Sequence, residues 1–221
     1  LGLADSAKMY ISQIEAAERS TGSLGGSLKR LAHYGAGGFA LVQLTQMAAS
    51  FGAAIFEAGV RSEKFTRTLV FVATGAGSTV GREMAFLRET VRELGLDFTT
   101  AADGFTKIAA AANGTKLAGQ GARDIFVAVS KASTAMGLSA AETQGALLAI
   151  GQMMSKGTVS AEELRGQLGE RLPGAFQIAA RAMGVSTAEL GKMLEAGSIA
   201  AEDMLPKLAA EMEKTFGATA Q

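Results

Sequence analysis

Few side chains in this 221-residue sequence are of the types that carry out catalysis or bind metals. Cysteine is absent, which excludes thiolate nucleophiles, thiolate metal sites and disulfides. His33 is the one histidine, and a catalytic histidine needs a partner that orients it. Serine is frequent, but no serine lies in a G-x-S-x-G nucleophile elbow. We therefore predict no catalytic residue, no metal ligand and no cofactor, and we interpret His33 as a surface or helix-end residue.

Carboxylates occur in adjacent pairs at two places, Glu162 with Glu163 and Glu202 with Asp203. Two carboxylates can share acid–base chemistry only if both side chains converge on one substrate. Neighbouring residues on a helix point in different directions, so neither pair is expected to converge. Both pairs are instead typical of the first turn of a helix, where the helix dipole favours negative charge.

The sequence also lacks the features that bind phosphate groups. The glycine-rich stretches 35–38 and 75–77 are not followed by a Lys-Ser/Thr pair and do not follow a predicted strand, so no phosphate loop is expected. Lys plus Arg and Asp plus Glu both total 21, and the isoelectric point is about 6.8. This balance gives no overall attraction to nucleic acid or to anionic lipid.

The composition predicts helices that pack closely. Apolar residues make up 48% of the sequence and the mean hydropathy is +0.22, which is high for a soluble protein that acts alone. Much of this content is alanine, a strong helix former, and glycine accounts for 28 residues, well above the usual share of about 7%. Proline occurs only at 173 and 206, so helices can run without interruption.

Apolar periodicity predicts an all-α fold, built as an array of short-to-medium helices with helical hairpins and without a β-strand. The run 68–72 contains β-type residues, but it lies in a helical register in which Phe65 and Val72 share a face. The expected helices are 60–74, 79–95, 99–113, 119–136, 139–156, 160–169, 174–183, 186–196 and 200–216.

Three of these helices begin with the pattern of a capping box, in which a serine and a glutamate three residues later cap each other's backbone amides. A glycine before each serine suits the left-handed end of the preceding helix. Hydrophobic staples are expected between Val159 and Leu164 and between Val185 and Leu190. The three sets are Gly137, Ser139 and Glu142; Gly157, Ser160 and Glu163; and Gly184, Ser186 and Glu189.

Three segments are expected along the chain. Residues 1–27 are an N-terminal helix followed by a Gly/Ser joint. Residues 28–59 are a long apolar Ala- and Gly-rich helix, and its uncharged centre, 35–56, is about long enough to cross a bilayer. Two alternatives remain for this segment: it packs among other protein helices, or it inserts into a membrane. Residues 60–217 are the helical domain.

Residues 177–194 have the outline of a helix-turn-helix, with a glycine in the turn. The second helix, 186–195, carries one lysine against two glutamates and has no Arg, Asn or Gln to contact base edges. Phosphates repel a net-negative helix. A helical hairpin used for packing is therefore favoured over DNA recognition, and no specific nucleic acid is expected as a partner.

A long string of motif residues lies in 157–212. It includes VSAEELRGQL at 159–168, LPGA at 172–175 and LGKML at 190–194, and residues 83–112 and 119–156 continue it more loosely. This string closely resembles the tape-measure domain of the tail-length tape-measure proteins of long-tailed phages, prophages and tail-like particles. Its length makes the match more specific than any short motif. The positions assigned to the family motif are Val159, Ser160, Glu163, Leu164, Gly166, Leu168, Leu172, Pro173, Gly174, Gly184, Leu190, Leu194, Leu205 and Pro206.

The sequence also gives local predictions for three polar residues and for one corner of the chain within this motif. Arg165, Glu170 and Arg171 are expected to form ion pairs on a solvated face. Pro173 and Gly174 are expected to mark the start of a helix after a corner.

The resemblance implies a mostly helical structural protein that spans the tail during assembly and thereby sets its length. Such proteins lie in the tube lumen, are coated by assembly chaperones and then by tube subunits, and leave ahead of the DNA. They are usually much longer than this sequence. The measuring length cannot lie here, because 221 residues of continuous helix would span only about 330 Å.

We therefore interpret the sequence as a structural and assembly module of a phage or phage-like tape-measure protein, and not as an enzyme. The expected location is the virion tail, in the tube lumen or at the tail end, and the host cytoplasm during assembly. Expected partners are other copies of the chain and tail tube, tail tip, baseplate or assembly chaperone proteins, bound through Ala/Gly-rich faces and residues 35–56. The alternatives are a segment, 28–60, that enters a membrane during genome ejection, and a helix-turn-helix nucleic-acid-binding module.

Overall fold

The computed structural model describes residues 63–219, and within this range the chain forms helices and no β-strand. The all-α prediction is thus confirmed, and the run 68–72 is helical. The segments predicted at 1–27 and 28–59, including the long apolar helix, lie outside the described residues. The elements are α4 (Glu63–Gly75), α5 (Val80–Leu94), α6 (Phe98–Ala112), α7 (Gln120–Ala135), α8 (Ala140–Lys156), the π-helix η1 (Glu162–Leu168), α9 (Gly169–Arg171), α10 (Ala175–Met183), α11 (Thr187–Glu195) and α12 (Ala201–Phe216).

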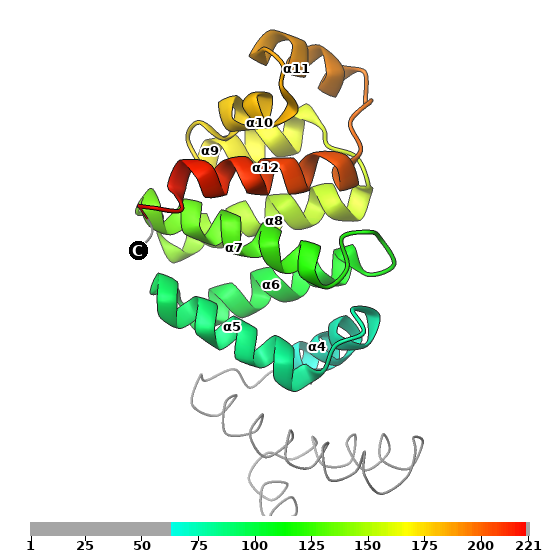
Figure 1. Ribbon diagram of the computed structural model, residues 1–221, viewed down its shortest axis with the longest axis vertical. Coiled ribbons are helices and arrows are strands. Elements are labelled where there is room, and N and C mark those ends of the chain that lie inside the picture. Colours follow the sequence, from blue (N-terminus) through cyan, green and yellow to red (C-terminus); the bar gives the residue numbers. More distant parts are fainter. Residues whose placement is uncertain (1–62, 220–221) are drawn as a thin grey trace, which may run out of the picture. The chain divides into compact units, whose positions relative to one another are not determined.

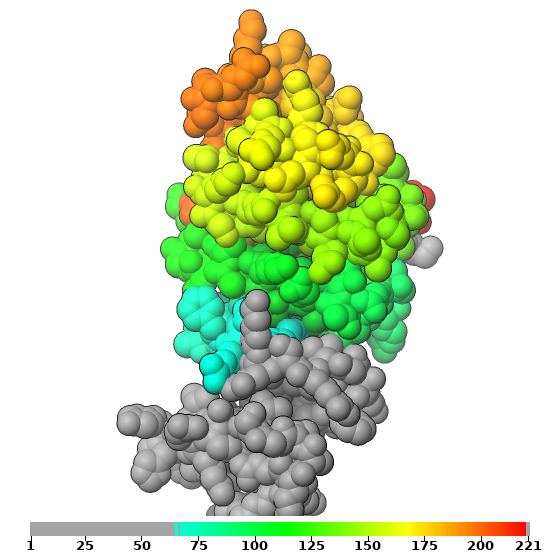
Figure 2. Space-filling model, turned by 180° about the vertical axis from the view of Figure 1, so that it is seen from behind, coloured from blue at the N-terminus to red at the C-terminus, as the bar shows by residue number. Residues whose placement is uncertain are grey.

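The helices from α5 onward are stacked in two layers (Figure 1). One layer holds α5, α7 and α12 side by side, and α6, α8 and η1 form the other. Figure 2 shows the face formed by α6, α8 and the segment from η1 to α10. The helix α7 is central, because it packs against α5, α6, α8 and α12. Its neighbour α12 is far from it in sequence, so the last helix closes the domain onto its middle.

One local geometry recurs at the corners between helices. Gly77, Gly95, Gly137, Gly184 and Gly197 have φ between 59° and 70°, a left-handed conformation that costs glycine little. The amide that follows each glycine donates to a carbonyl five residues back at 2.8–3.2 Å, which is the Schellman end of a helix. The left-handed conformation predicted at 137, 157 and 184 is therefore confirmed, since the φ of Gly157 is 73°.

The three predicted capping boxes have three different outcomes. Ser139 and Glu142 form the complete box at the start of α8. Ser186 accepts from the amide of Glu189 at 3.1 Å, which is one half of the box. The box predicted for Ser160 and Glu163 is wrong, because the Ser160 hydroxyl donates to the Glu163 carboxylate instead of accepting from the backbone.

Two further caps do not fit the Ser-x-x-Glu pattern. Asp97 accepts from the Thr100 amide at 2.7 Å to start α6, and Thr79 accepts from the Arg82 amide at 3.3 Å to start α5. In neither helix is the residue three positions after the cap a glutamate. The sequence could therefore indicate these two caps only through the preference of Asp and Thr for the N-cap position.

Small residues let α6 and α8 approach closely. A Cβ added at Gly104 on α6 would lie 2.4 Å from Leu147 Cδ1 and 2.9 Å from Leu147 Cβ on α8. Buried alanines flank this contact on both helices, among them Ala101 and Ala146. The Ala- and Gly-rich face of α6 is thus already used within the chain. This contact fits the close packing of helices that the composition predicts, whereas the contacts with other copies stay a prediction.

Three phenylalanines join the helices at the other side of α6. The rings of Phe86 on α5, Phe105 on α6 and Phe126 on α7 have centroids 5.3–6.1 Å apart in tilted or edge-on arrangements. Such arrangements add stabilisation beyond the area buried. This cluster fixes α5 against α6 and α7 and lies beside the polar contacts described below.

Candidate functional site

No group of three or more His, Cys, Asp or Glu within residues 63–219 is arranged to hold a metal. His33 lies outside that range. Glu202 is half-buried and accepts weakly from the Lys116 amide at 3.4 Å, whereas Asp203 is exposed. Both line an open hollow of about 200 Å³ between the loop 115–117, the end of α8 and the start of α12.

The apolar residues of the family motif form part of the core. Seven of them are at most 4% exposed, and most are completely buried. They come from the loop before η1, from η1 itself, from the turn after α9, and from α11 and α12, so the motif specifies how these elements pack together. Its role in function stays a prediction. The seven residues are Val159, Leu164, Leu168, Leu172, Leu190, Leu194 and Leu205.

The glycines and prolines of the motif lie at corners or on the surface. Gly174 has a φ of 86° and is the N-cap of α10, so a helix does start after this corner, as predicted. Pro173 is exposed and precedes that cap, and so it is not in the first helical turn. Pro206 is exposed within α12. Gly166 lies in η1, where an added Cβ would meet nothing within 4 Å.

Glu163 is a buried carboxylate at the start of η1. It is 1% exposed, pairs with the Lys156 ammonium through one oxygen, and accepts from the Ser160 hydroxyl through the other. Burial alone would raise its pKa, but the hydrogen bonds from Lys156 and Ser160 outweigh this and hold the pKa below the ordinary 4.5. The Glu163 hydrogen bond in turn raises the pKa of Lys156. The carboxylate therefore anchors the end of α8 to the beginning of η1.

The helix that follows is a π-helix, in which the Gly169 amide donates to the carbonyl of Leu164, five residues back. The ion pairs predicted for Arg165, Glu170 and Arg171 are absent from the part of the chain that the structure describes. Arg165 instead stacks on the Phe176 ring of α10, with Cζ 4.3 Å from the ring centroid. Arg171 donates to the Gln167 carbonyl at 2.6 Å. The prediction of local ion pairs at Arg165, Glu170 and Arg171 is thus wrong.

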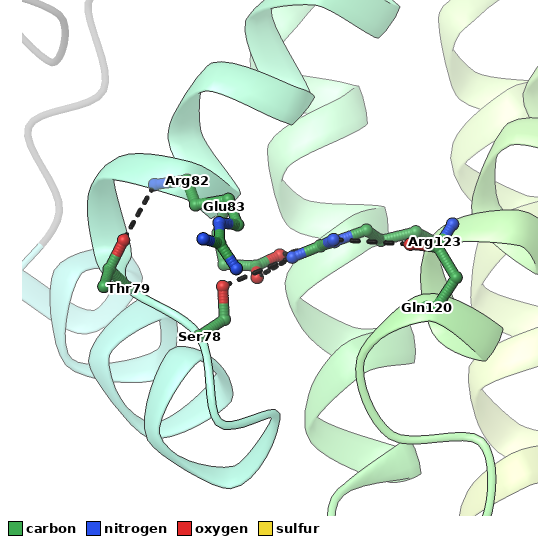
Figure 3. Close-up of polar contacts among 6 residues, drawn as sticks. All are labelled: Ser78, Thr79, Arg82, Glu83, Gln120 and Arg123. Atoms are coloured by element: carbon green, nitrogen blue, oxygen red, sulfur yellow. Dashed lines mark hydrogen bonds and ion pairs between the residues drawn. The ribbon is translucent and has the colours of Figure 1, made fainter.

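A second buried ion pair was not predicted from the sequence. Glu83 on α5 is 1% exposed and binds the Arg123 guanidinium of α7 with both oxygens, one of them 3.2 Å from Nε (Figure 3). Arg123 also donates to Ser78 Oγ at 3.3 Å and to Gln120 Oε1 at 3.4 Å, and its Cζ lies 5.6 Å from the centroid of the Phe86 ring. The α4–α5 corner is thereby tied to α7.

The hairpin at 177–194 consists of α10 and α11, joined by the corner at Gly184. Leu190 and Leu194 are the buried residues of α11, which packs mainly on α10. The exposed charges of α11 are Glu189, Lys192 and Glu195, a net charge of −1 from one positive and two negative groups. The structure confirms a helical hairpin at this place, and the preference for packing over DNA recognition stays a prediction.

The described residues form an all-α domain whose core contains the apolar residues of the family motif. The model of the tape measure protein family matches residues 55–221. Over 188 residues the chain is 32% identical to a probable tape measure protein of Salmonella phage Felix O1, and this match covers 84% of the chain. The chain belongs to the tape measure protein family, and it is thus a structural component of a phage tail.

The chain spans about a quarter of the length of that phage relative, 24%. No solved structure matches the chain.

Proposed function

We propose that residues 63–219 are a folded assembly module of a tail tape measure protein, and that this module acts through its surfaces and not through catalysis. The observation that carries the proposal is the place of the family motif. Its apolar residues, such as Leu164 and Leu168, build the core of a helical domain within a chain that belongs to the family. The matched string therefore specifies a fold, and its function depends on that fold being formed.

The module is poorly suited to be the part that sets length. The longest described helix, α8, has 17 residues and spans only about 26 Å at 1.5 Å per residue. The chain then turns back on itself at every glycine corner, which shortens the reach of the segment. Length determination belongs, in this proposal, to the remainder of a much longer protein, and the module supports tail assembly at one end of it.

The partners proposed for this module are other copies of the chain and tail tube, tail tip, baseplate or chaperone proteins. Its proposed location is the tube lumen or the tail end, after assembly in the host cytoplasm. Among the helices of residues 63–219, none combines the length and the apolar character needed to cross a bilayer. The alternative proposed from the sequence, in which residues 28–60 enter a membrane during genome ejection, stays a separate candidate.

A pair of substitutions in a phage that carries this chain tests whether the folded state matters. Leu164→Asp places a charge at a completely buried position, whereas Ala210→Asp adds the same charge at an exposed position of α12. We expect the first variant to lose the helical signal of the purified chain and to give few intact tails in electron micrographs. The second variant is expected to behave like the wild type. Normal tails from an unfolded Leu164→Asp variant would overturn the proposal.

A further inference from the structure

The helix α11 is attached to the domain more weakly than the other helices of its length. Only Leu190 and Leu194 of its nine residues are buried, and α10 is its main neighbour. By contrast, the nine residues of α10 include four buried ones, and α10 contacts η1 and α12 as well as α11. Figure 1 shows α11 at the end of the stack, beyond α10. Segments with few buried apolar contacts are the ones that open locally.

Sharp corners of the chain bound α11 on both sides. Gly184 precedes it with a φ of 70°, and Gly197 follows it with a φ of 62°, so each end is a glycine corner. Beyond the second corner the chain is fixed again, because the Val159 amide donates to the Ile199 carbonyl and the Ala201 amide to the Gly157 carbonyl, both at 3.0 Å. The segment 185–198 is therefore a flap held between two fixed points.

One side chain of η1 lies next to both helices of the hairpin. The Arg165 guanidinium, which comes from η1, stacks on Phe176 of α10. On α11, the position that a Cβ of Gly191 would take lies 3.4 Å from Arg165 Nη2. The guanidinium thus contacts the ring of α10 and lies beside α11 at Gly191, where an added Cβ would be at ordinary van der Waals distance from it. The exposed charges of α11 form no ion pair with the described remainder of the domain.

We propose that residues 185–198 form a flap that opens independently of the rest of the domain, with Arg165 as its latch. Opening detaches Leu190 and Leu194 from α10 and exposes both apolar surfaces, while the clamp between Ile199 and Val159 keeps α12 in place. The flap is a conformational device that the assembly function does not require. An experiment that contradicts the flap would therefore leave the proposed assembly function standing.

Hydrogen exchange measured by mass spectrometry on the whole chain tests this device. In the wild type, amides of α11 should exchange at least ten-fold faster than those of α7, since local opening exposes α11 alone. Arg165→Gln should speed exchange in α11 by a further two- to five-fold, about the effect of losing one exposed cation–π contact, and leave α7 unchanged. Arg88→Gln, at an exposed position on α5, is the matched control and should change neither helix.

A second variant separates the latch from a general loss of stability. Phe176→Leu keeps an apolar side chain but removes the ring, so it should speed exchange in α11 as Arg165→Gln does, and the double variant should add nothing further. Equal exchange of α11 and α7 in the wild type would overturn the flap. An unchanged α11 in both single variants, or faster exchange of all helices together, would overturn the latch.

Discussion

Glu83 and Glu163 look alike in the sequence, since each lies early in a helix, and the fold buries both of them. Each is 1% exposed and each is paired, Glu83 with Arg123 and Glu163 with Lys156. A buried carboxylate without a partner would be strongly unfavourable, so the two pairs decide whether these helix starts can lie against the core. We therefore expect both ion pairs to contribute to the free energy of unfolding, and substitution of either glutamate should change it measurably.

Glu83→Gln should destabilise the domain strongly. The substitution leaves the Arg123 guanidinium, whose side chain is 16% exposed, without its counter-charge, and breaking a buried pair in this way typically costs about 3–5 kcal/mol. Glu89→Gln is the matched control, because Glu89 pairs with Arg92 at 3.7 Å on the surface and should contribute less than about 1 kcal/mol. Urea unfolding of both variants measures the difference. Equal losses in the two would contradict a structural role for the buried pair.

Acid should weaken the contribution of Glu163. Its pKa in the folded chain is below the ordinary 4.5, so the unfolded chain binds the proton more readily. The stabilisation by Glu163 is thus fully present above about pH 4.5 and is lost as pH falls through the lower folded pKa. The difference in unfolding free energy between wild type and Glu163→Gln should be constant from pH 5 to about 8 and shrink below 4.5. A difference that grows in acid would contradict this assignment.

The sequence could not reveal that these two glutamates are buried. The partner of Glu83 lies forty residues away on another helix, and nothing in the local pattern connects them. Ser160 and Glu163 have the same spacing as the complete capping box of Ser139 and Glu142. What differs is Lys156, whose ammonium draws the Glu163 carboxylate away from the backbone.

At the scale of the elements, close contact between α6 and α8 depends on the missing side chain of Gly104. Gly104→Ala should destabilise the domain by about 1–3 kcal/mol, since the new Cβ would lie 2.9 Å from Leu147 Cβ and the two helices would have to separate. Gly166→Ala is the control, because its Cβ would meet nothing within 4 Å and alanine favours a helix. Thermal unfolding distinguishes them. A Gly104→Ala variant as stable as Gly166→Ala would contradict the close packing.

Helix boundaries were predictable because their signals are local. Glycine corners and the caps at Ser139 and Ser186 act over a few residues, so they can be read along the sequence. The π-helix was not predictable, since its hydrogen bonds depend on how η1 lies against α8 and α10. The ion pairs expected around Arg165 were not formed either, because its guanidinium stacks on a ring of α10, a partner that the local sequence does not indicate.

At the scale of the whole molecule, the order of the layers is set by contacts between distant segments. Lys131 on α7 pairs with Glu213 on α12 at 2.5 Å, and Arg181 on α10 pairs with Glu211 on α12 at 3.0 Å. These pairs accompany the buried apolar face of α12, which includes Leu205 and Leu208. The periodicity of α12 predicted an amphipathic helix, but it could not indicate that the partner would be α7.

We propose above all that residues 63–219 are a folded assembly module of a tape measure protein and do not belong to the part that measures the tail. Tail lengths in electron micrographs test it most directly, in a phage whose tape measure protein lacks residues 64–216 in frame. A deletion of the same number of residues elsewhere in that protein is the control and should give intact tails that are proportionally shorter. The module deletion should give few or aberrant tails. Intact tails, shortened only in proportion to the residues removed, would contradict the account.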